Sequence, residues 1–300
     1  MAEIILLHGI AQEQRSADSL QSTWLVALAS GIRTAGSEEL ADRIWRDGRP
    51  GNARMAFYGD PFRRAGQQPG TADALTLEQQ ALYDALLAKV LANAADRGID
   101  ERDRLEAEHV LAANQLDRQC VRDMAHSLLN VLLRVGPFAR LCLSAGERLL
   151  GALRQVSLYL TDDEIRAAAQ QCILDLVDSD TQVIIAHLLS TVVAYEALHR
   201  VDQPLPLLVT LESPLGMRTV IYERLRPQHA QVLASVWSWV NVADRDDLGA
   251  AALDLTASFP GADGVLESHW TVDNGGKPYE ATHYLTKAEI GRSVAVALAS

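Results

Sequence analysis

Residues 181–195 constrain the fold of this chain more than any other stretch, because an apolar strand pattern there breaks abruptly into an apolar helix pattern. The turn between them reads Ala186-His187-Leu188-Leu189-Ser190. Its flanking residues, Ala186 and Ser190, are small, as a sharp turn requires where a strand and a helix approach closely. The stretch therefore predicts a buried strand, a tight turn and a buried helix in succession.

The rest of the chain alternates short apolar runs of strand length with longer segments of helical period. This alternation favours an α/β fold with a mostly parallel sheet and helices on both faces. A helix is expected over Trp24–Ile32 and a closing helix over 287–298. The expected strands are Ile4–Leu7, Arg54–Tyr58, Val183–Ile185, Leu207–Thr210, Val236–Val242 and Ser268–Val272.

A long helix-forming segment interrupts this alternation between residues 71 and 160, where Ala, Leu, Arg, Glu and Gln dominate. It is too long for a loop and too helical for a linker. The sequence therefore predicts a core made of residues 1–70 and 161–300 and a helical insertion, 71–160, that acts as a cap or lid. Two interpretations stay open: a helical hairpin packed on the sheet, or an apolar roof over a hydrophobic ligand.

Composition limits the partners and the location of the protein. The net charge is −12 and no run of Lys and Arg forms a basic face, so nucleic acid is not an expected partner. No stretch of 18 apolar residues is present, so no membrane span is expected. The first residues read as a core strand without the pattern of a signal peptide, which favours a cytoplasmic protein. The long apolar helices allow a homodimer.

Several motifs, taken in this order and spacing, resemble those of the α/β-hydrolase superfamily, over nearly the whole chain apart from the insertion. The turn is similar to the Ala-His-Ser-Leu-Gly-Thr nucleophile elbow of bacterial serine-hydrolase-like proteins and differs from it only at Leu188 and Ser190. The matching segments are Ile-Leu-Leu-His8-Gly9-Ile10, Ala186–Ser190, Glu212–Gly216, Asn241–Asp247 and Lys277–Gly291.

The resemblance implies an oxyanion hole built from two backbone N–H groups. The segment His8-Gly9-Ile10 would supply one of them from Ile10, and Leu189 would supply the other at the start of the helix. Gly9 has a second interpretation, in which His8-Gly9 is only a tight turn after the first strand.

The nucleophile position of the resemblance holds Leu188, which has no lone pair with which to attack a carbonyl. Ser190 is a candidate replacement, although it occupies the small position two residues later. An elbow centred on Ser190 would place Leu188 and Val192 where the strand and the helix approach most closely. His187 is expected to pack below the sheet and to line the site rather than to act as a catalytic group.

The acid and the base of a catalytic triad are each open between two residues. Asp247 is the first choice for the acid and Asp244 the second, while a plain acidic loop capping the next helix is the alternative. The family's spacing places the base at Tyr279, whose ordinary pKa near 10 does not suit a base at neutral pH. His283, just before Tyr284, is the other candidate base.

Three hypotheses about function follow. The first is a pseudoenzyme with a degenerate catalytic triad that binds a small apolar or acyl-type molecule without hydrolysing it. The second is a biosynthetic enzyme that reuses the pocket for cyclisation or rearrangement. The third is a hydrolase of esters or amides with a relocated nucleophile or an activated water, which would use Ser190 or Asp247 together with His283. No metal site and no cofactor are expected, because no histidine or carboxylate spacing suits a metal and no glycine-rich phosphate loop is present.

Overall fold

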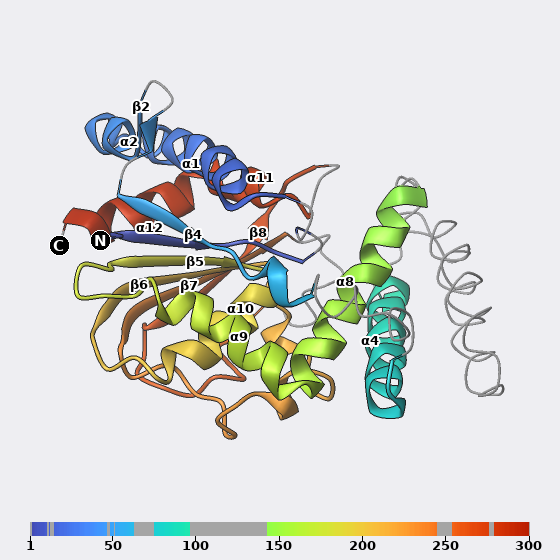
Figure 1. Cartoon of the computed structure of the whole chain (residues 1–300). Helices are drawn as coiled ribbons and strands as arrows, with labels where there is room; N and C mark the ends of the chain where they lie inside the picture. The colour runs from blue at the N-terminus through green and yellow to red at the C-terminus, as the bar shows by residue number, and fades with distance from the viewer. Residues whose placement is uncertain are drawn as a thin grey trace. The chain divides into compact units, whose positions relative to one another are not determined.

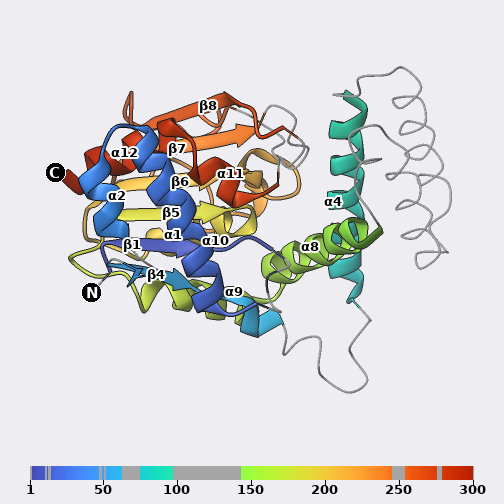
Figure 2. The same ribbon diagram turned by 90° about the horizontal axis from the view of Figure 1, so that it is seen from above.

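A sheet of six strands, all neighbouring pairs parallel, forms the centre of the computed structural model (Figure 1). The structure describes residues 2–10, 12, 15–46, 49–50, 52–62, 75–96, 143–244, 254–275 and 279–299. The strand order is β4-β1-β5-β6-β7-β8, which can be followed in Figure 2. The strands are β1 (Ile4–Leu7), β4 (Ala53–Ala56), β5 (Val183–His187), β6 (Leu205–Leu211), β7 (Val236–Asp244) and β8 (Leu266–Val272).

Helices cover both faces of this sheet (Figure 1). One face carries α1 (Ala17–Thr34), α2 (Glu38–Ile44), α11 (Ala281–Leu285) and α12 (Ala288–Ala299). The other face carries α9 (Asp163–Leu174) and α10 (Leu189–Leu198). Every residue of β1 and of β5 is buried, as expected for parallel strands covered on both sides. The predicted α/β fold with a mostly parallel sheet is confirmed.

Glycines allow α1 and α12 to cross at short range. A Cβ atom on Gly31 would lie 2.1 Å from the carbonyl oxygen of Leu285, and one on Gly291 would lie 2.2 Å from that of Gly31. Neither position has room for a side chain. Around this crossing Trp24, Leu25 and other apolar residues of α1 pack into one core with the inward side chains of the sheet.

The predicted elements recur with shifted ends, and short elements appear that the hydrophobic pattern did not predict. Helix α1 begins at Ala17, well before the predicted start at Trp24, because Ser16 caps it and its hydroxyl accepts a hydrogen bond from the Ser19 N–H. The elements missing from the prediction are α2, α9, α11, the strand pair β2 (Trp45–Arg46) and β3 (Arg49–Pro50), and the 3₁₀ helices η1 (Pro214–Gly216) and η2 (Tyr222–Arg224).

The chain divides into two compact units, of which Met1–Ala72 together with Asp162–Ser300 is one and Asp73–Thr161 is the other. Within the second unit, α4 (Leu77–Asp96) packs against α8 (Leu143–Thr161). The Ser157 hydroxyl there donates to the carbonyl oxygen of Gln79 at 2.7 Å. The role of the second unit as a cap stays a prediction.

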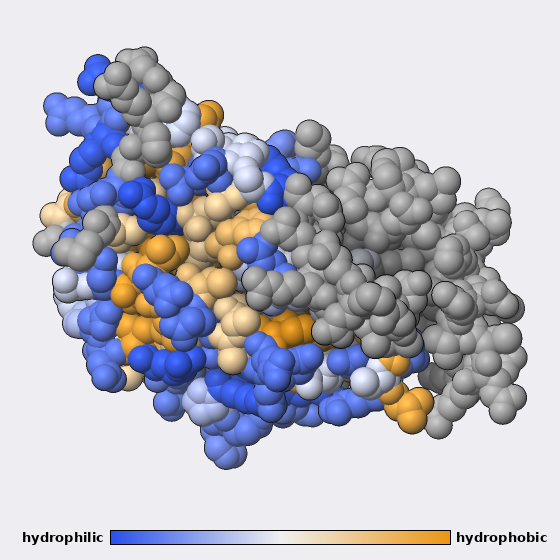
Figure 3. All heavy atoms as spheres, in the orientation of Figure 1, coloured by the Kyte–Doolittle hydropathy of each residue, from blue (hydrophilic) through white to orange (hydrophobic). Residues whose placement is uncertain are grey.

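Strand β4 is one edge of the sheet and faces the viewer in Figures 1 and 3. One backbone N–H at this edge has a hydrogen-bond partner outside the sheet, because the Gln21 side chain of α1 accepts from the Met55 N–H at 3.0 Å. Figure 3 shows hydrophilic residues around apolar ones on this side of the described structure.

None of the described helices is both long enough and apolar enough to cross a bilayer.

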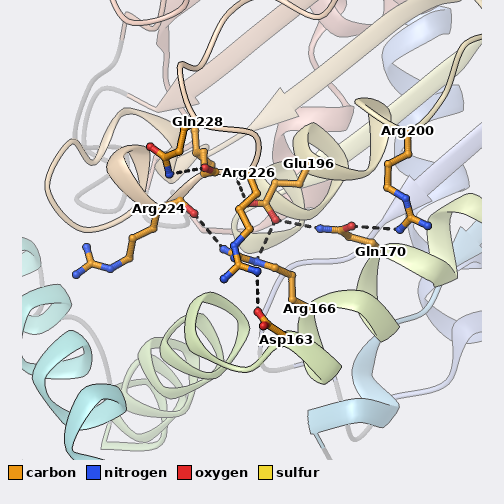
Figure 4. Close-up of polar contacts among 9 residues, drawn as sticks. Asp163, Arg166, Gln170, Glu196, Arg200, Arg224, Arg226 and Gln228 are labelled. Carbon is orange, nitrogen blue, oxygen red and sulfur yellow. Dashed lines mark hydrogen bonds and ion pairs between the residues drawn. The ribbon is translucent and has the colours of Figure 1, made fainter.

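A buried ion pair joins α9 to α10 (Figure 4). Arg166 Nε lies 3.2 Å from Glu196 Oε2, and both side chains are almost fully buried. The same carboxylate accepts hydrogen bonds from the Gln170 side chain at 3.0 Å and from the Arg226 backbone N–H at 2.9 Å. Arg166 also donates to the carbonyl oxygen of Arg224. These bonds distribute the buried charge over several partners, as a buried carboxylate requires.

Candidate functional site

Polar side chains follow the carboxyl ends of neighbouring strands. They are His8 after β1, His187 at the end of β5, Glu212 after β6, Asp244 at the end of β7 and Asn274 after β8. All are buried, with 6% exposure or less. Parallel strands present their carboxyl ends at one edge of the sheet, which is where ligand sites of open α/β folds lie. This edge is therefore the candidate functional site.

Leu188 occupies a strained turn between β5 and α10. Its backbone angles are φ 55° and ψ −126°, a conformation that non-glycine residues rarely adopt and that costs roughly 1–3 kcal/mol. The turn is held on both sides, since the Leu188 N–H donates to the carbonyl oxygen of Leu211 at 2.9 Å. The Leu188 carbonyl accepts from the Thr191 hydroxyl at 2.7 Å. The strain is thus imposed by fixed neighbours on a half-buried leucine.

The Leu188 side chain lies against the backbone of Gly9. A Cβ atom on Gly9 would lie 3.2 Å from Leu188 Cδ1 and 2.5 Å from His187 Nδ1. The structure therefore brings together two of the sequence-predicted site positions, and Gly9 allows the contact by having no side chain. Ile10 follows Gly9 and is half-buried, and Leu189 is the first residue of α10.

The Ser190 hydroxyl is committed to the backbone of the turn. Ser190 is fully buried, and its oxygen accepts a hydrogen bond from the His187 N–H at 2.8 Å. The hydroxyl itself lies 3.0 Å from the carbonyl oxygen of Leu7 and 2.9 Å from that of His187, to either of which it can donate. The geometry therefore supports a structural role for Ser190, which ties the turn to β1.

The ring of His187 contacts Glu212 through Nε2 and Oε2. Glu212 itself has a positive φ of 50° and is fully buried. Burial raises the pKa of the Glu212 carboxyl well above its ordinary value, and the charges of Asp244 and Glu280 raise it further, while the nearby Tyr284 hydroxyl opposes the shift. Among the described acidic residues of the site, Glu212 therefore has the most strongly shifted pKa, and it lies beside an imidazole.

His8 is held as a neutral imidazole. Its Nδ1 lies 2.7 Å from the Gly9 carbonyl oxygen, to which only an N–H can donate, and its Nε2 accepts from the Tyr58 N–H at 3.2 Å. The Tyr58 ring stacks on the His8 ring at 4.3 Å, and its hydroxyl donates to the His8 carbonyl oxygen. Burial, together with the charge of nearby His187, lowers the pKa of His8 to about 4, and the hydrogen bond to Gly9 opposes this shift. Both ring nitrogens therefore have hydrogen-bond partners within the protein, which gives His8 a structural role at the end of β1.

Asp244, the second choice for the acid, belongs to a chain of buried polar groups. The Asn274 N–H donates to the Asp244 carboxylate at 2.5 Å, and the Asp244 N–H donates to the Tyr284 hydroxyl at 3.0 Å. Asp247, the first choice, lies outside the described residues.

The two candidate bases have different places. His283 is half-buried in α11, and its ring makes no hydrogen bond or ion pair with the described part of the chain. Tyr279 precedes α11 and is also half-buried. Sequence reasoning missed Glu212, Asn274 and Tyr284 as site residues. The only sequence signals for them were that Glu212 and Asn274 each follow a strand and that Tyr284 directly follows the candidate base His283.

The described residues contain no group of three His, Cys, Asp or Glu side chains that could hold a metal ion. Comparisons with protein-family models, with curated proteins and with solved structures gave no match.

Proposed function

We propose that this protein is a non-hydrolytic, α/β-hydrolase-like pseudoenzyme that binds a small apolar or acyl-type molecule. The observation that carries this proposal is the backbone of Leu188, which keeps the positive φ of a nucleophile elbow while it presents only hydrocarbon. A leucine cannot form an acyl-enzyme, so covalent hydrolysis at this residue has no chemical basis.

The place of the turn in the sheet supports the proposal. In an α/β-hydrolase the nucleophile follows an inner strand of a parallel sheet and immediately precedes a helix. Leu188 has the same relation to β5, which lies between β1 and β6, and to α10. A strained backbone persists only when the surroundings impose it, and strained residues gather at functional sites. The leucine side chain at this turn, in contact with Gly9, then provides an apolar surface for the ligand.

A second candidate function is favoured by the buried couple of His187 and Glu212. An imidazole oriented by a carboxyl group can move a proton without any covalent intermediate. In this case the same edge would catalyse a cyclisation or rearrangement of its ligand. The two candidates share the ligand site and differ in whether the bound molecule changes.

Binding is tested with octanamide, an acyl molecule that resists hydrolysis, by isothermal titration calorimetry on the full chain. We expect binding by the wild type and a loss of about tenfold or more in Leu188→Asn, since that variant places a polar group in the apolar contact. Leu298→Asn, a change at a half-buried leucine near the end of α12, is the control and should bind as the wild type does.

Hydrolysis is tested with p-nitrophenyl octanoate and a serine-directed fluorophosphonate. We expect neither turnover nor labelling. The double variant Leu188→Ser with Ser190→Gly separates the two candidates, because new esterase activity would require a working base and oxyanion hole and would favour the second. Ester hydrolysis by the wild type that is lost in Ser190→Ala would overturn both.

A further inference from the structure

Two buried side chains at the carboxyl edge carry polar atoms without a hydrogen-bond partner. They are Oε1 of Glu212 and both Nδ2 and Oδ1 of Asn274. Glu212 is 0% exposed and Asn274 is 6% exposed. An unsatisfied buried polar atom costs about 1–3 kcal/mol, and few survive in native structures without a reason. Their presence in one region indicates a place where another molecule supplies the missing bonds.

The two side chains belong to one connected cluster. The Asn274 backbone N–H donates to the Asp244 carboxylate, and the Asp244 N–H donates to the Tyr284 hydroxyl. The Tyr284 hydroxyl in turn lies close enough to the Glu212 carboxyl to lower its pKa by hydrogen bonding. Glu212 and Asn274 are therefore the ends of a short chain of contacts across the ends of β6, β7 and β8, and they are not isolated packing defects.

The electrostatic surroundings of Glu212 are acidic. The Glu212 carboxyl contacts the His187 ring through Oε2, and the charges that raise its pKa, those of Asp244 and Glu280, are both negative. A bound cation would reduce the repulsion among these groups, whereas a bound anion would increase it.

We propose that Glu212 and Asn274 bind a primary ammonium group that carries a neighbouring oxygen, as in an amino alcohol. An ammonium group has three N–H donors and no acceptor, and the site offers two free acceptors, Glu212 Oε1 and Asn274 Oδ1. The Asn274 Nδ2 donor requires an acceptor, which the oxygen of the ligand supplies. The proposal does not depend on an apolar ligand at Leu188, and either can fail without the other.

The test uses ethanolamine hydrochloride as the probe, with the full chain in isothermal titration calorimetry at constant ionic strength. Choline is the matched control ligand, because it keeps the charge and the hydroxyl group but has no N–H donor. We expect ethanolamine to bind and choline to bind at least about tenfold more weakly. Equal binding of the two cations, or no heat with ethanolamine, overturns the proposal.

Variants then locate the binding. Asn274→Ala removes the side-chain amide and keeps the backbone bond to Asp244, so it is expected to fold, and it should weaken ethanolamine binding about tenfold. Glu212→Gln should do the same, because glutamine cannot become the carboxylate that a bound ammonium group would stabilise. Glu223→Gln, a change at an exposed position, should bind ethanolamine as the wild type does. Unchanged binding in Asn274→Ala overturns the assignment even where Glu212→Gln fails to fold.

Discussion

His187 ends β5, Glu212 directly follows the adjacent strand β6, and the two side chains contact each other through Nε2 and Oε2. The register of β5 and β6 pairs His187 with Leu211, the residue directly before Glu212, and so brings the two side chains to one level of the sheet edge. Both are withdrawn from solvent. Leu188 and Glu212, the residues that follow these strands, each have a positive φ. The strain is therefore concentrated at the strand ends that carry this couple.

The Glu212 carboxyl should make stability fall as the pH rises. Because its pKa in the folded protein lies well above the ordinary value of 4.5, the folded state keeps a proton that the unfolded state has lost. The stabilising effect is complete below about pH 4.5 and disappears as the pH rises through the folded pKa. We expect Glu212→Gln to lose this dependence, which amounts to about 1.4 kcal/mol for each pH unit in the window. Urea unfolding of both proteins from about pH 5 to about pH 8 measures it. Parallel curves would contradict the prediction.

His8 should have the opposite effect. Its folded pKa of about 4 lies below the ordinary value of 6.5, so the unfolded state binds a proton first as the pH falls. Stability from the neutral ring is present above about pH 6.5 and lost towards pH 4, by roughly 3 kcal/mol in all. We expect His8→Asn to be less stable at neutral pH and to lose much less on acidification. Urea unfolding at neutral and acid pH, with Glu212→Gln as the comparison of opposite sign, tests this.

Ser190→Ala should reduce stability without removing any reaction of the protein. The substitution leaves the buried His187 N–H without its acceptor, for which we expect a loss of about 1–3 kcal/mol in the free energy of unfolding. Ser22→Ala, at an exposed position of α1, should change it by less than about 0.5 kcal/mol. Fluorophosphonate labelling of the wild type that disappears in Ser190→Ala would show instead that the hydroxyl is reactive.

The sheet could be predicted from the sequence because parallel strands buried on both faces are continuous apolar runs. Residues 183–186 are one such run, and their burial follows from their apolar composition. Helix α2 was missed since it is a short helix that is followed directly by β2, and its ends depend on local backbone geometry rather than on a hydrophobic period. The start of α1 was misplaced because the cap at Ser16, and not the first apolar residue, sets where the helix begins.

The candidate site was predicted only in part. Gly9 and Leu188 were each predicted as site positions from sequence motifs, whereas their contact and the partners of Glu212 depend on the fold, including the register of β5 and β6 and the packing of α11. The sequence pattern also could not predict that the Ser190 hydroxyl hydrogen-bonds to backbone atoms of β1 and β5, because Leu7 is distant from Ser190 in the sequence. Long-range pairing therefore decided which polar residues share the site.

Gly9→Ala and Gly151→Ala should have opposite effects on stability. A Cβ atom on Gly9 would lie 2.5 Å from the ring of the buried His187, so we expect a loss of about 1–3 kcal/mol and a displaced Leu188 contact. Gly151 lies within α8 and has no atom within 4 Å of the added carbon, so alanine should stabilise by up to about 1 kcal/mol. Thermal unfolding of both variants measures the contrast, and a neutral Gly9→Ala would show that the turn can relax.

The buried pair of Arg166 and Glu196 should behave as a coupled unit. Arg166→Leu leaves a buried carboxylate without its cation, for which we expect a loss of about 3–5 kcal/mol. Adding Glu196→Gln removes the charge and keeps an oxygen that can accept from the Arg226 N–H, so the double variant should be more stable than Arg166→Leu alone. Asp163→Asn, in an exposed pair with Arg226, should cost under about 1 kcal/mol. Urea unfolding of the singles and the double variant gives the coupling energy, and additive losses would show that the two side chains act independently.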